Sequence, residues 1–406
     1  MTVEKINTTF FTNMMISARI ATLFMVIGIL FSTALLSIGE FIILVTWILL
    51  LVSGHNIKEQ LTISFNLPMV KVGLVLLSFI FLHISTSTNV VATSSSQFLH
   101  YRELLLLPLL LFILNSHNWK KIIYYSFLAG MTLVLVHSYL QFFSLVPNSP
   151  SLDEPNTSTI GRIAGAIMLA FTCYAFLEEA LRNKSSYLFW VWLILFFAGS
   201  FALLFFYNGR TGALIYFVIL FTWGFRFLGK KGIVIAMVLA SLISTVLYHT
   251  SPSVKSRIDQ THRQLHSLLH IETSPTDPTR VGLYSRTVSM MKKHSMARTI
   301  LGGGGGSFRS ESKQHQFIMT NPHNEYLLAF FENGVIGLLL LLAFFILTWR
   351  QSKDIDEHEK WLLRALVITF GIGCLFNSLL LDNREAHFYV LLLATLIPPI
   401  KKLNSN

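Results

Sequence analysis

His323 lies in the stretch NPHNEYLLAFFENGVIG, where a polar cluster with a titratable ring meets an apolar run suited to lipid. Asn321 and Pro322 are residue types typical of an N-cap and a first helical position, so His323 is expected in the first turn of a membrane helix. The positive end of a helix dipole disfavours imidazolium and would keep the ring neutral. The stretch therefore predicts a general base at a membrane surface, with a polar residue that caps a helix as the alternative.

Two arginines are expected at positions where a bound anion would favour a cation. Arg210, in FYNGRTGAL, is expected to end an apolar helix at the membrane boundary, where a cation is costly unless it reaches water or binds an anion. Arg280, in DPTRVGLYSR, is expected to begin a helix, where the positive end of the dipole does not stabilise a cation. Guanidinium forks match phosphate oxygens, so the pair predicts an anion site. Extension of Arg210 toward water is the alternative.

The helices that must hold these residues are membrane helices. Hydrophobic residues make up 53% of the 406 positions, Phe alone occurs 34 times, and charged residues make up 13%, which excludes an ordinary water-soluble globule. Apolar runs of about 20 residues predict an all-α, polytopic fold with about twelve transmembrane helices. They are expected near 20–37, 40–53, 69–85, 98–115, 122–146, 160–180, 187–207, 211–226, 232–249, 324–348, 361–380 and 386–400.

The boundaries of this arrangement are least certain at the start. The first two spans share a long apolar run interrupted only by Glu40, so eleven helices are the alternative. The first helix is expected to be retained, because no small-residue cleavage site follows a short apolar core. Cys173 and Cys374 both fall in apolar runs and indicate neither a disulfide framework nor a thiolate metal site.

The basic residues predict the orientation. Lys and Arg gather in short connections such as NWKK, RNKSS and RFLGKKG, which are expected to face the cytoplasm. Residues 1–249 then form the first nine transmembrane helices, 250–322 an extracytoplasmic loop, and 323–406 the last three helices. The expected localisation is a bacterial inner membrane, with the site on the periplasmic face. The basic loop calls for an anionic partner such as membrane lipid or a diphosphate-linked substrate, and nucleic acid is not expected there.

The loop is expected to contain two amphipathic helices that are too short to span a membrane. The first covers residues 253–272 and aligns His262, His266 and His270 on one face. No acid or cysteine has ligand spacing with these histidines, so a solvated polar face is favoured over a metal site. The second helix begins at Arg280 and leads to five glycines at 302–306. These glycines lack the Lys and Ser/Thr of a phosphate-binding loop and predict a turn back to the membrane.

Taken together, the pattern resembles the O-antigen ligases, within the wider superfamily of O-antigen ligases and polymerases. The motifs that carry the resemblance are the Arg of NGRTG, the Arg of TRVGLY with the following Gly-rich turn LGGGGGSF, and HNEYLLAFFENGVIG. The family implies about twelve helices with one large extracytoplasmic loop before the tenth. It also implies that Arg210, Arg280 and His323 line the active site, with Arg286 as the other candidate for the loop arginine.

The resemblance further implies a reaction. A glycan on undecaprenyl diphosphate would be the donor, a sugar hydroxyl of lipid A-core the acceptor, and the transfer would be metal-independent, without a cofactor, and inverting. The arginines would stabilise the departing diphosphate while His323 takes the hydroxyl proton. Further candidate site residues, which would orient the ring, bind sugar or match a family aspartate, are Asn324, Glu325, Tyr326, Asp382 and Arg384. Tyr326 is equally suited to anchor a helix at the interface.

Two other functions are compatible with the sequence. A polysaccharide polymerase would use nearly the same chemistry on the same carrier lipid, and the single dominant loop favours a ligase over it. A transporter would be expected to carry ionisable residues or broken helices near the middle of the membrane. Most charges of this sequence are expected at helix ends instead, which disfavours transport.

Overall fold

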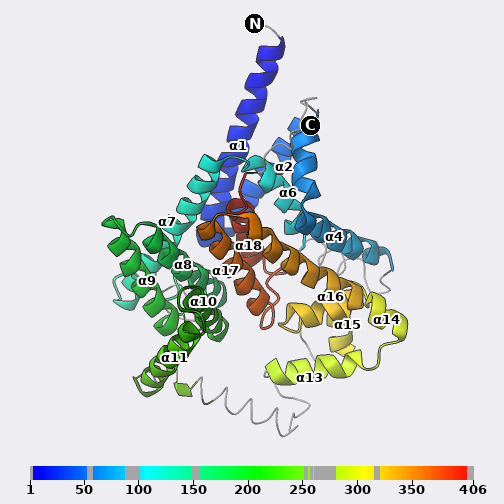
Figure 1. Cartoon of the computed structure of the whole chain (residues 1–406). Helices are drawn as coiled ribbons and strands as arrows, with labels where there is room; N and C mark the ends of the chain where they lie inside the picture. Colours follow the sequence, from blue (N-terminus) through cyan, green and yellow to red (C-terminus); the bar gives the residue numbers. More distant parts are fainter. Residues whose placement is uncertain are drawn as a thin grey trace.

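The protein is an assembly of α-helices (Figure 1). The computed structural model describes residues 3–52, 58–86, 101–148, 156–207, 209–250, 255–256, 259, 280–314 and 321–399, and no strand forms within them. The helices are α1 (Val3–Phe31), α2 (Thr33–Val52), α3 (Lys58–Asn66), α4 (Pro68–Thr86), α6 (Glu103–Ile113), α7 (His117–Phe142), α8 (Arg162–Arg182), α9 (Leu188–Phe205), α10 (Arg210–Leu228), α11 (Lys230–Thr250), α13 (Arg280–Met291), α14 (Met296–Leu301), α15 (Ser307–Gln314), α16 (Glu325–Gln351), α17 (Glu357–Gly373) and α18 (Asn383–Leu396), with a short 3₁₀ turn, η1 (Ser352–Asp354).

Each of the twelve expected spans overlaps at least one of these helices, and the all-α, polytopic membrane fold is confirmed. Within the described ranges, seven helices are long and apolar enough to cross a membrane: most of α1, together with α2, α7, α8, α9, α10 and α16. Shorter apolar stretches lie in α4 and α6. The expected helix of residues 253–272, with its three histidines, lies outside the described residues apart from three isolated positions.

The boundary between the first two helices was predicted wrongly. The break lies at Ser32 rather than near Ile38, and α1 begins well before the predicted start. The two helices pack so closely that a Cβ added to Gly28 would lie 2.3 Å from the backbone nitrogen of Leu36. Gly39, which marked the expected break, is an interior residue of α2 that faces the Ala21 carbonyl at a similarly close approach.

The core of the bundle is formed by α8 and α18. Every residue of α8 from Ala164 to Ala180 is buried, as is every residue of α18 from Glu385 to Leu396. The helices α9, α10 and α11 lie on one side of α17 and α18, and α4 and α16 on the other (Figure 1). The interiors of α8 and α18 are therefore surrounded by protein.

One charge cluster lies inside the bundle rather than at helix ends. The guanidinium of Arg102 donates to both carboxylate oxygens of Glu40, at 2.9 and 3.1 Å, and so connects the start of α6 to the interior of α2. His387 of α18 approaches the same carboxylate at 3.6 Å. Such a pair is stable in an apolar region because each charge is partnered. Glu40, inside α2, is thus an exception to the expectation that most charges lie at helix ends.

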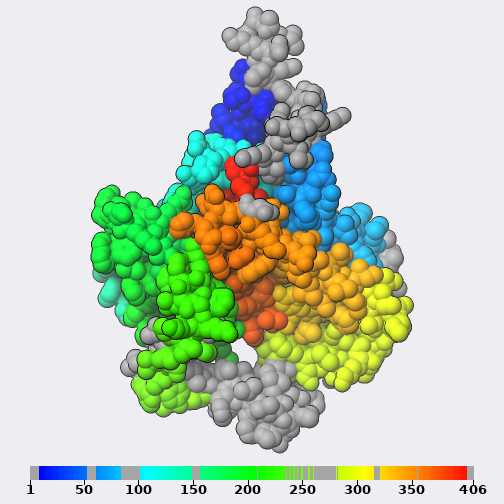
Figure 2. Space-filling view, viewed as in Figure 1, coloured from blue at the N-terminus to red at the C-terminus, as the bar shows by residue number. Residues whose placement is uncertain are grey.

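The segment before α16 folds onto it as a compact unit. Leu283, Phe308 and Phe331 belong to a small apolar cluster, separate from the main core, that joins α13 and α15 to the first turns of α16. Arg298 of α14 pairs with Glu311 and lies over the Phe331 ring, with its central carbon 5.6 Å from the ring centre. In Figure 2 the yellow surface of residues 280–314 is continuous with the orange surface of α16.

The backbone of the glycine run, residues 302–306, packs directly against the backbone of α16. Gly334 interrupts that helix with φ 63° and ψ −166°, which releases carbonyl groups from the helical hydrogen-bond pattern. The N–H groups of Gly303 and Gly304 donate to the Phe331 and Glu332 carbonyls at 3.1 and 2.8 Å. A Cβ on Gly302 would lie 2.3 Å from the Glu332 oxygen. The predicted turn is thus a packed junction that compensates a break in a membrane helix.

Candidate active site

The first turn of α13 lies across the segment that precedes α16. Arg280, the first residue of α13, donates from its guanidinium to the Asn377 side-chain oxygen at 3.2 Å. Tyr284, one turn later, has its hydroxyl 3.2 Å from the His323 carbonyl and 2.9 Å from the Leu375 carbonyl, and donates to this pair of acceptors. These contacts bring the arginine of one sequence motif beside the histidine of another.

His323 occupies a different position from the predicted first helical turn. The N-cap of α16 is Asn324, whose side-chain oxygen accepts from the Leu327 N–H at 3.0 Å, so His323 precedes the helix. The Asn321 side chain instead accepts from the His323 N–H at 2.8 Å and forms a local turn. His323 itself adopts φ 49°, a left-handed conformation that non-glycine residues take up mainly in turns and at functional sites.

The environment of His323 keeps its ring neutral. Its side chain is exposed at the surface of the site. Desolvation by the surrounding protein, followed by the positive charge of Arg280, lowers the pKa of His323 below its ordinary value of 6.5. The expected neutral ring therefore follows from the neighbouring protein and Arg280, whereas the prediction had invoked the helix dipole alone.

The residues that follow His323 are engaged within the protein. Glu325 is fully buried, and its carboxylate accepts from the Tyr101 hydroxyl and from the Leu380 N–H, the latter at 3.1 Å. The Asn324 amide donates to the Leu375 carbonyl at 2.9 Å, and the Tyr326 hydroxyl donates to the Gly371 carbonyl at 2.7 Å. These three side chains fix the start of α16 against α6 and the α17–α18 connection, and so hold His323 in place.

Four arginines stand at the starts of helices at one end of the bundle, the arginine end. Arg162, Arg210 and Arg280 are the first residues of α8, α10 and α13, and Arg384 is the second residue of α18. Arg210 thus begins a helix, whereas the sequence had suggested that it ends the preceding one. The positive ends of four helix dipoles and four guanidinium groups together create a region that favours anions.

Contacts between the helices bring these starts together. A Cβ on Gly212 would lie 2.5 Å from the Ala166 Cβ, so α8 and α10 are in close contact next to their first residues. Arg384 donates to the Thr159 carbonyl, just before α8, at 3.0 Å. Burial and then the charge of Arg162 lower the pKa of Arg280, while Tyr284 opposes the shift. Arg162 is therefore an electrostatic neighbour of Arg280.

Two further predicted residues lie at the edge of this arrangement. Arg286 donates to the Gly282 carbonyl of its own helix at 3.1 Å. The charge that lowers the pKa of His323 is that of Arg280. Asp382 is the N-cap residue of α18, without a side-chain hydrogen bond to that helix, and its charge acts on Glu325. The geometry favours Arg280 over Arg286 as the loop arginine next to the histidine.

The sequence reasoning missed four residues of this region. Tyr284 is part of the TRVGLY motif, and its spacing of one turn from Arg280 was a usable signal. Tyr101, Asn377 and Arg162 carried no such signal, because their places depend on contacts with segments far away in the chain. The described residues contain no group of three or more His, Cys, Asp or Glu side chains that could hold a metal ion.

The chain was compared with known proteins. Residues 193–342 match the model of the family described as O-antigen ligase. The matched segment runs from α9 to the middle of α16 and includes Arg210, Arg280 and His323, while Arg162 and Arg384 lie outside it. No curated protein matches the chain.

Proposed function

Residues 193–342 match the O-antigen ligase family model, and from this match we propose that the chain transfers a glycan from undecaprenyl diphosphate to a sugar hydroxyl of lipid A-core. The match supports a glycosyl-transferring membrane enzyme of the O-antigen ligase type. The observation that carries the finer proposal is the placing of Arg280 beside His323 at the arginine end. A cationic region next to a neutral base is what a diphosphate leaving group and a hydroxyl nucleophile require.

The reaction is a single displacement. The acceptor hydroxyl oxygen attacks the anomeric carbon as the bond from that carbon to the diphosphate oxygen breaks, which inverts the configuration. The departing electron pair and its charge remain on the diphosphate, where Arg280 and Arg210 stabilise them. His323 accepts the hydroxyl proton through its ring nitrogen. Because guanidinium groups relieve the charge of the leaving group, this route requires no metal ion.

The structural residues around the site have positioning roles in this proposal. Asn377 and Tyr284 hold the start of α13, so the Arg280 fork stays beside the histidine. Glu325 and Tyr101 support the start of α16 from inside the bundle. Both substrates carry lipid chains, and the site accordingly lies next to the first turns of a candidate membrane span, α16.

The first prediction concerns the product. We expect the purified chain, supplied in nanodiscs with polymer on the carrier lipid and with lipid A-core, to move the polymer onto lipid A-core. Mass analysis of the two lipid fractions measures this transfer. Longer glycan on the carrier, with lipid A-core unchanged, would identify a polymerase instead. If neither product forms while folded protein is present, the proposal of glycan transfer is wrong.

The second prediction concerns orientation, with the arginine end expected in the periplasm. Met296, between α13 and α16, is 77% exposed, and Lys353 of η1 is exposed near the other end of α16. The native Cys173 and Cys374 are both buried, so the wild type provides an unlabelled background. A membrane-impermeant maleimide should label Met296→Cys in intact spheroplasts and Lys353→Cys only after lysis. The opposite labelling pattern would reverse the orientation and refute the periplasmic placing of the site.

A further inference from the structure

A cavity of about 430 Å³ lies at the end of the bundle opposite the arginine end. It is bounded by the first turns of α7, the last residue of α8, the start of α17 and the end of α18. The helix α8 runs from Arg162 at the arginine end to Arg182 at the cavity, which places the two about 30 Å apart along its axis. This volume lies within the range usual for small-molecule sites.

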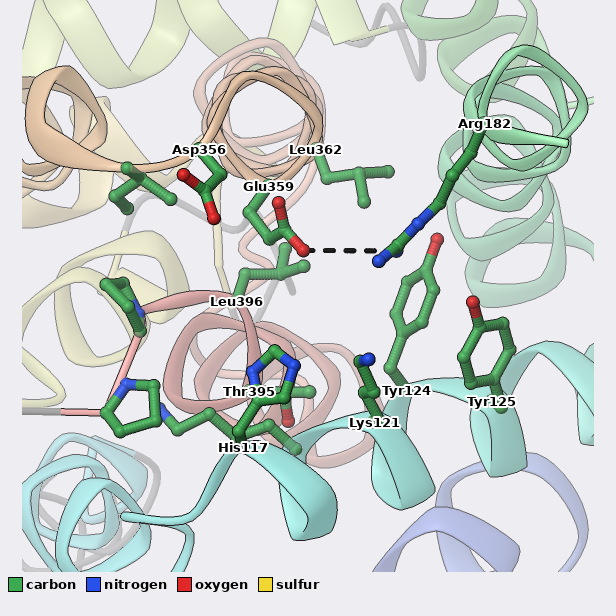
Figure 3. A pocket seen from close by; sticks show the side chains of 14 residues that line it. His117, Lys121, Tyr124, Tyr125, Arg182, Asp356, Glu359, Leu362, Thr395 and Leu396 are labelled. Atoms are coloured by element: carbon green, nitrogen blue, oxygen red, sulfur yellow. Dashed lines mark ion pairs between the residues drawn. The ribbon is translucent and has the colours of Figure 1, made fainter.

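Charges of opposite sign face each other across the cavity. Lys121 extends from α7 on one side, where the His117 ring also lines the cavity, and Asp356 and Glu359 extend from the start of α17 on the other (Figure 3). Arg182 lies at the edge, with a guanidinium nitrogen 3.9 Å from a Glu359 oxygen. The cavity therefore suits a ligand that carries both an anion and a cation.

The neighbouring Lys120 also lines the cavity, but its ammonium group is bound to the protein and is not directed to a ligand as that of Lys121 can be. Its ammonium group donates to the carbonyls of Ala394, at 2.9 Å, and Ile397, and so caps the end of α18. Lys121 is exposed and lies next to the first turn of α7, where the Ser116 side chain makes no capping hydrogen bond. The N–H groups of that turn strengthen the preference of this wall for an anion.

The cavity lies where two candidate membrane spans end, the position at which lipid headgroups are expected. His117 is the first residue of one candidate span and Arg182 the last residue of another. An exposed apolar stripe leads away from the cavity along α7, with the spacing of one helix face. It consists of Ile122, Tyr125, Ala129, Leu133 and Val136, and Tyr125 also lines the cavity. A ligand with a charged head and an apolar chain would fit both features.

We propose that this cavity binds the headgroup of an aminophospholipid. The phosphate lies toward Lys121 and Arg182, the ammonium group lies toward Asp356 and Glu359, and an acyl chain follows the α7 stripe. Basic pockets between transmembrane helices commonly hold lipid phosphate, and the acidic wall adds selectivity for an amine. This site is independent of the proposed glycan transfer, because it lies at the other end of α8 and α18.

The test is lipid competition on the purified full chain in nanodiscs made from equal parts of phosphatidylethanolamine, phosphatidylglycerol and phosphatidylcholine. We expect native mass spectrometry to find phosphatidylethanolamine enriched by on the order of fivefold among retained lipids. Lys121→Ala and Asp356→Asn should each abolish this enrichment. Lys184→Ala removes an exposed charge just beyond α8, outside the cavity, and should retain it.

Each remaining outcome contradicts the proposal. If the wild type retained phosphatidylglycerol as well as phosphatidylethanolamine, Asp356 and Glu359 would not select for the amine. This comparison needs no variant. Loss of enrichment in Lys184→Ala to the same degree would show a general effect of surface charge. Thermal stabilisation by soluble O-phosphorylethanolamine that equals that of the lipid would show that no acyl chain is bound at α7.

Discussion

Replacement of His323 by Gln should lower kcat for glycan transfer by about 10²- to 10⁴-fold while donor binding changes little. Gln keeps a hydrogen-bonding side chain but cannot accept the acceptor's proton, so the defect should lie in the displacement itself. His323→Asn is the companion variant, because Asn tolerates the positive φ of this position better than most residues do. The measurement is steady-state transfer by the purified chain with lipid-linked donor and lipid A-core.

The control for this prediction is another histidine at a helix end. His137, whose ring lies 3.0 Å from the Ser158 hydroxyl, occupies α7 and is not part of the proposed site. His137→Gln should transfer glycan at close to the wild-type rate. Near wild-type turnover in both His323 variants would reject the base assignment, and the proton acceptor would then have to be sought elsewhere at the arginine end.

Replacement of Arg280 by Gln should have two separable effects. Loss of the guanidinium should slow transfer by on the order of 10²- to 10³-fold, because charge on the departing diphosphate is no longer stabilised. In addition, Arg280 lowers the pKa of His323, and a base is active only above its pKa. The wild-type rate should therefore fall on acidification with a midpoint below pH 6.5, and in Arg280→Gln this midpoint should move upward.

Two matched variants separate the charge of Arg280 from its geometry. Arg280→Lys keeps the charge and loses the fork, so the rate should fall while the acid midpoint stays close to that of the wild type. Arg210→Gln removes a guanidinium from α10 and should lower the rate without moving the midpoint. An unchanged midpoint in Arg280→Gln would contradict the coupling between Arg280 and His323, and unchanged rates in Arg280→Gln and Arg210→Gln would contradict their part in binding diphosphate.

The sequence predicted the all-α, polytopic fold because apolar runs of the right length depend only on local composition, whereas seven helices in the described ranges are long and apolar enough to span a membrane, against about twelve expected. It also identified Arg210, Arg280 and His323, since their motifs are short and continuous. The start of α16 was misplaced because Asn321 and Asn324 are equally good cap residues, and only the fold shows which of them bonds the helix. Similarly, the break expected between residues 37 and 40 falls at Gly39, which instead lies inside α2 and permits close packing.

Contacts between residues far apart in the sequence could not be predicted from local motifs. Asn377 reaches Arg280 and Tyr101 reaches Glu325 from segments about 100 and 220 residues away, and nothing in their neighbourhoods indicates a partner. The left-handed conformation of His323 is likewise imposed by its surroundings, because a histidine has no strong preference for it. Local sequence therefore suggested the chemistry, and tertiary packing determines the geometry in which it operates.

The contact between Gly302 and Gly334 limits which segments can be exchanged between similar proteins in a chimera. The glycine run donates its N–H groups to a membrane helix that is broken to receive them, so neither partner is complete alone. A chimera that exchanged residues 280–314 but kept an uninterrupted α16 would place side chains where two backbones now touch. Residues 280–314 and the first three turns of α16 should therefore be exchanged together, with the join placed beyond Gly334.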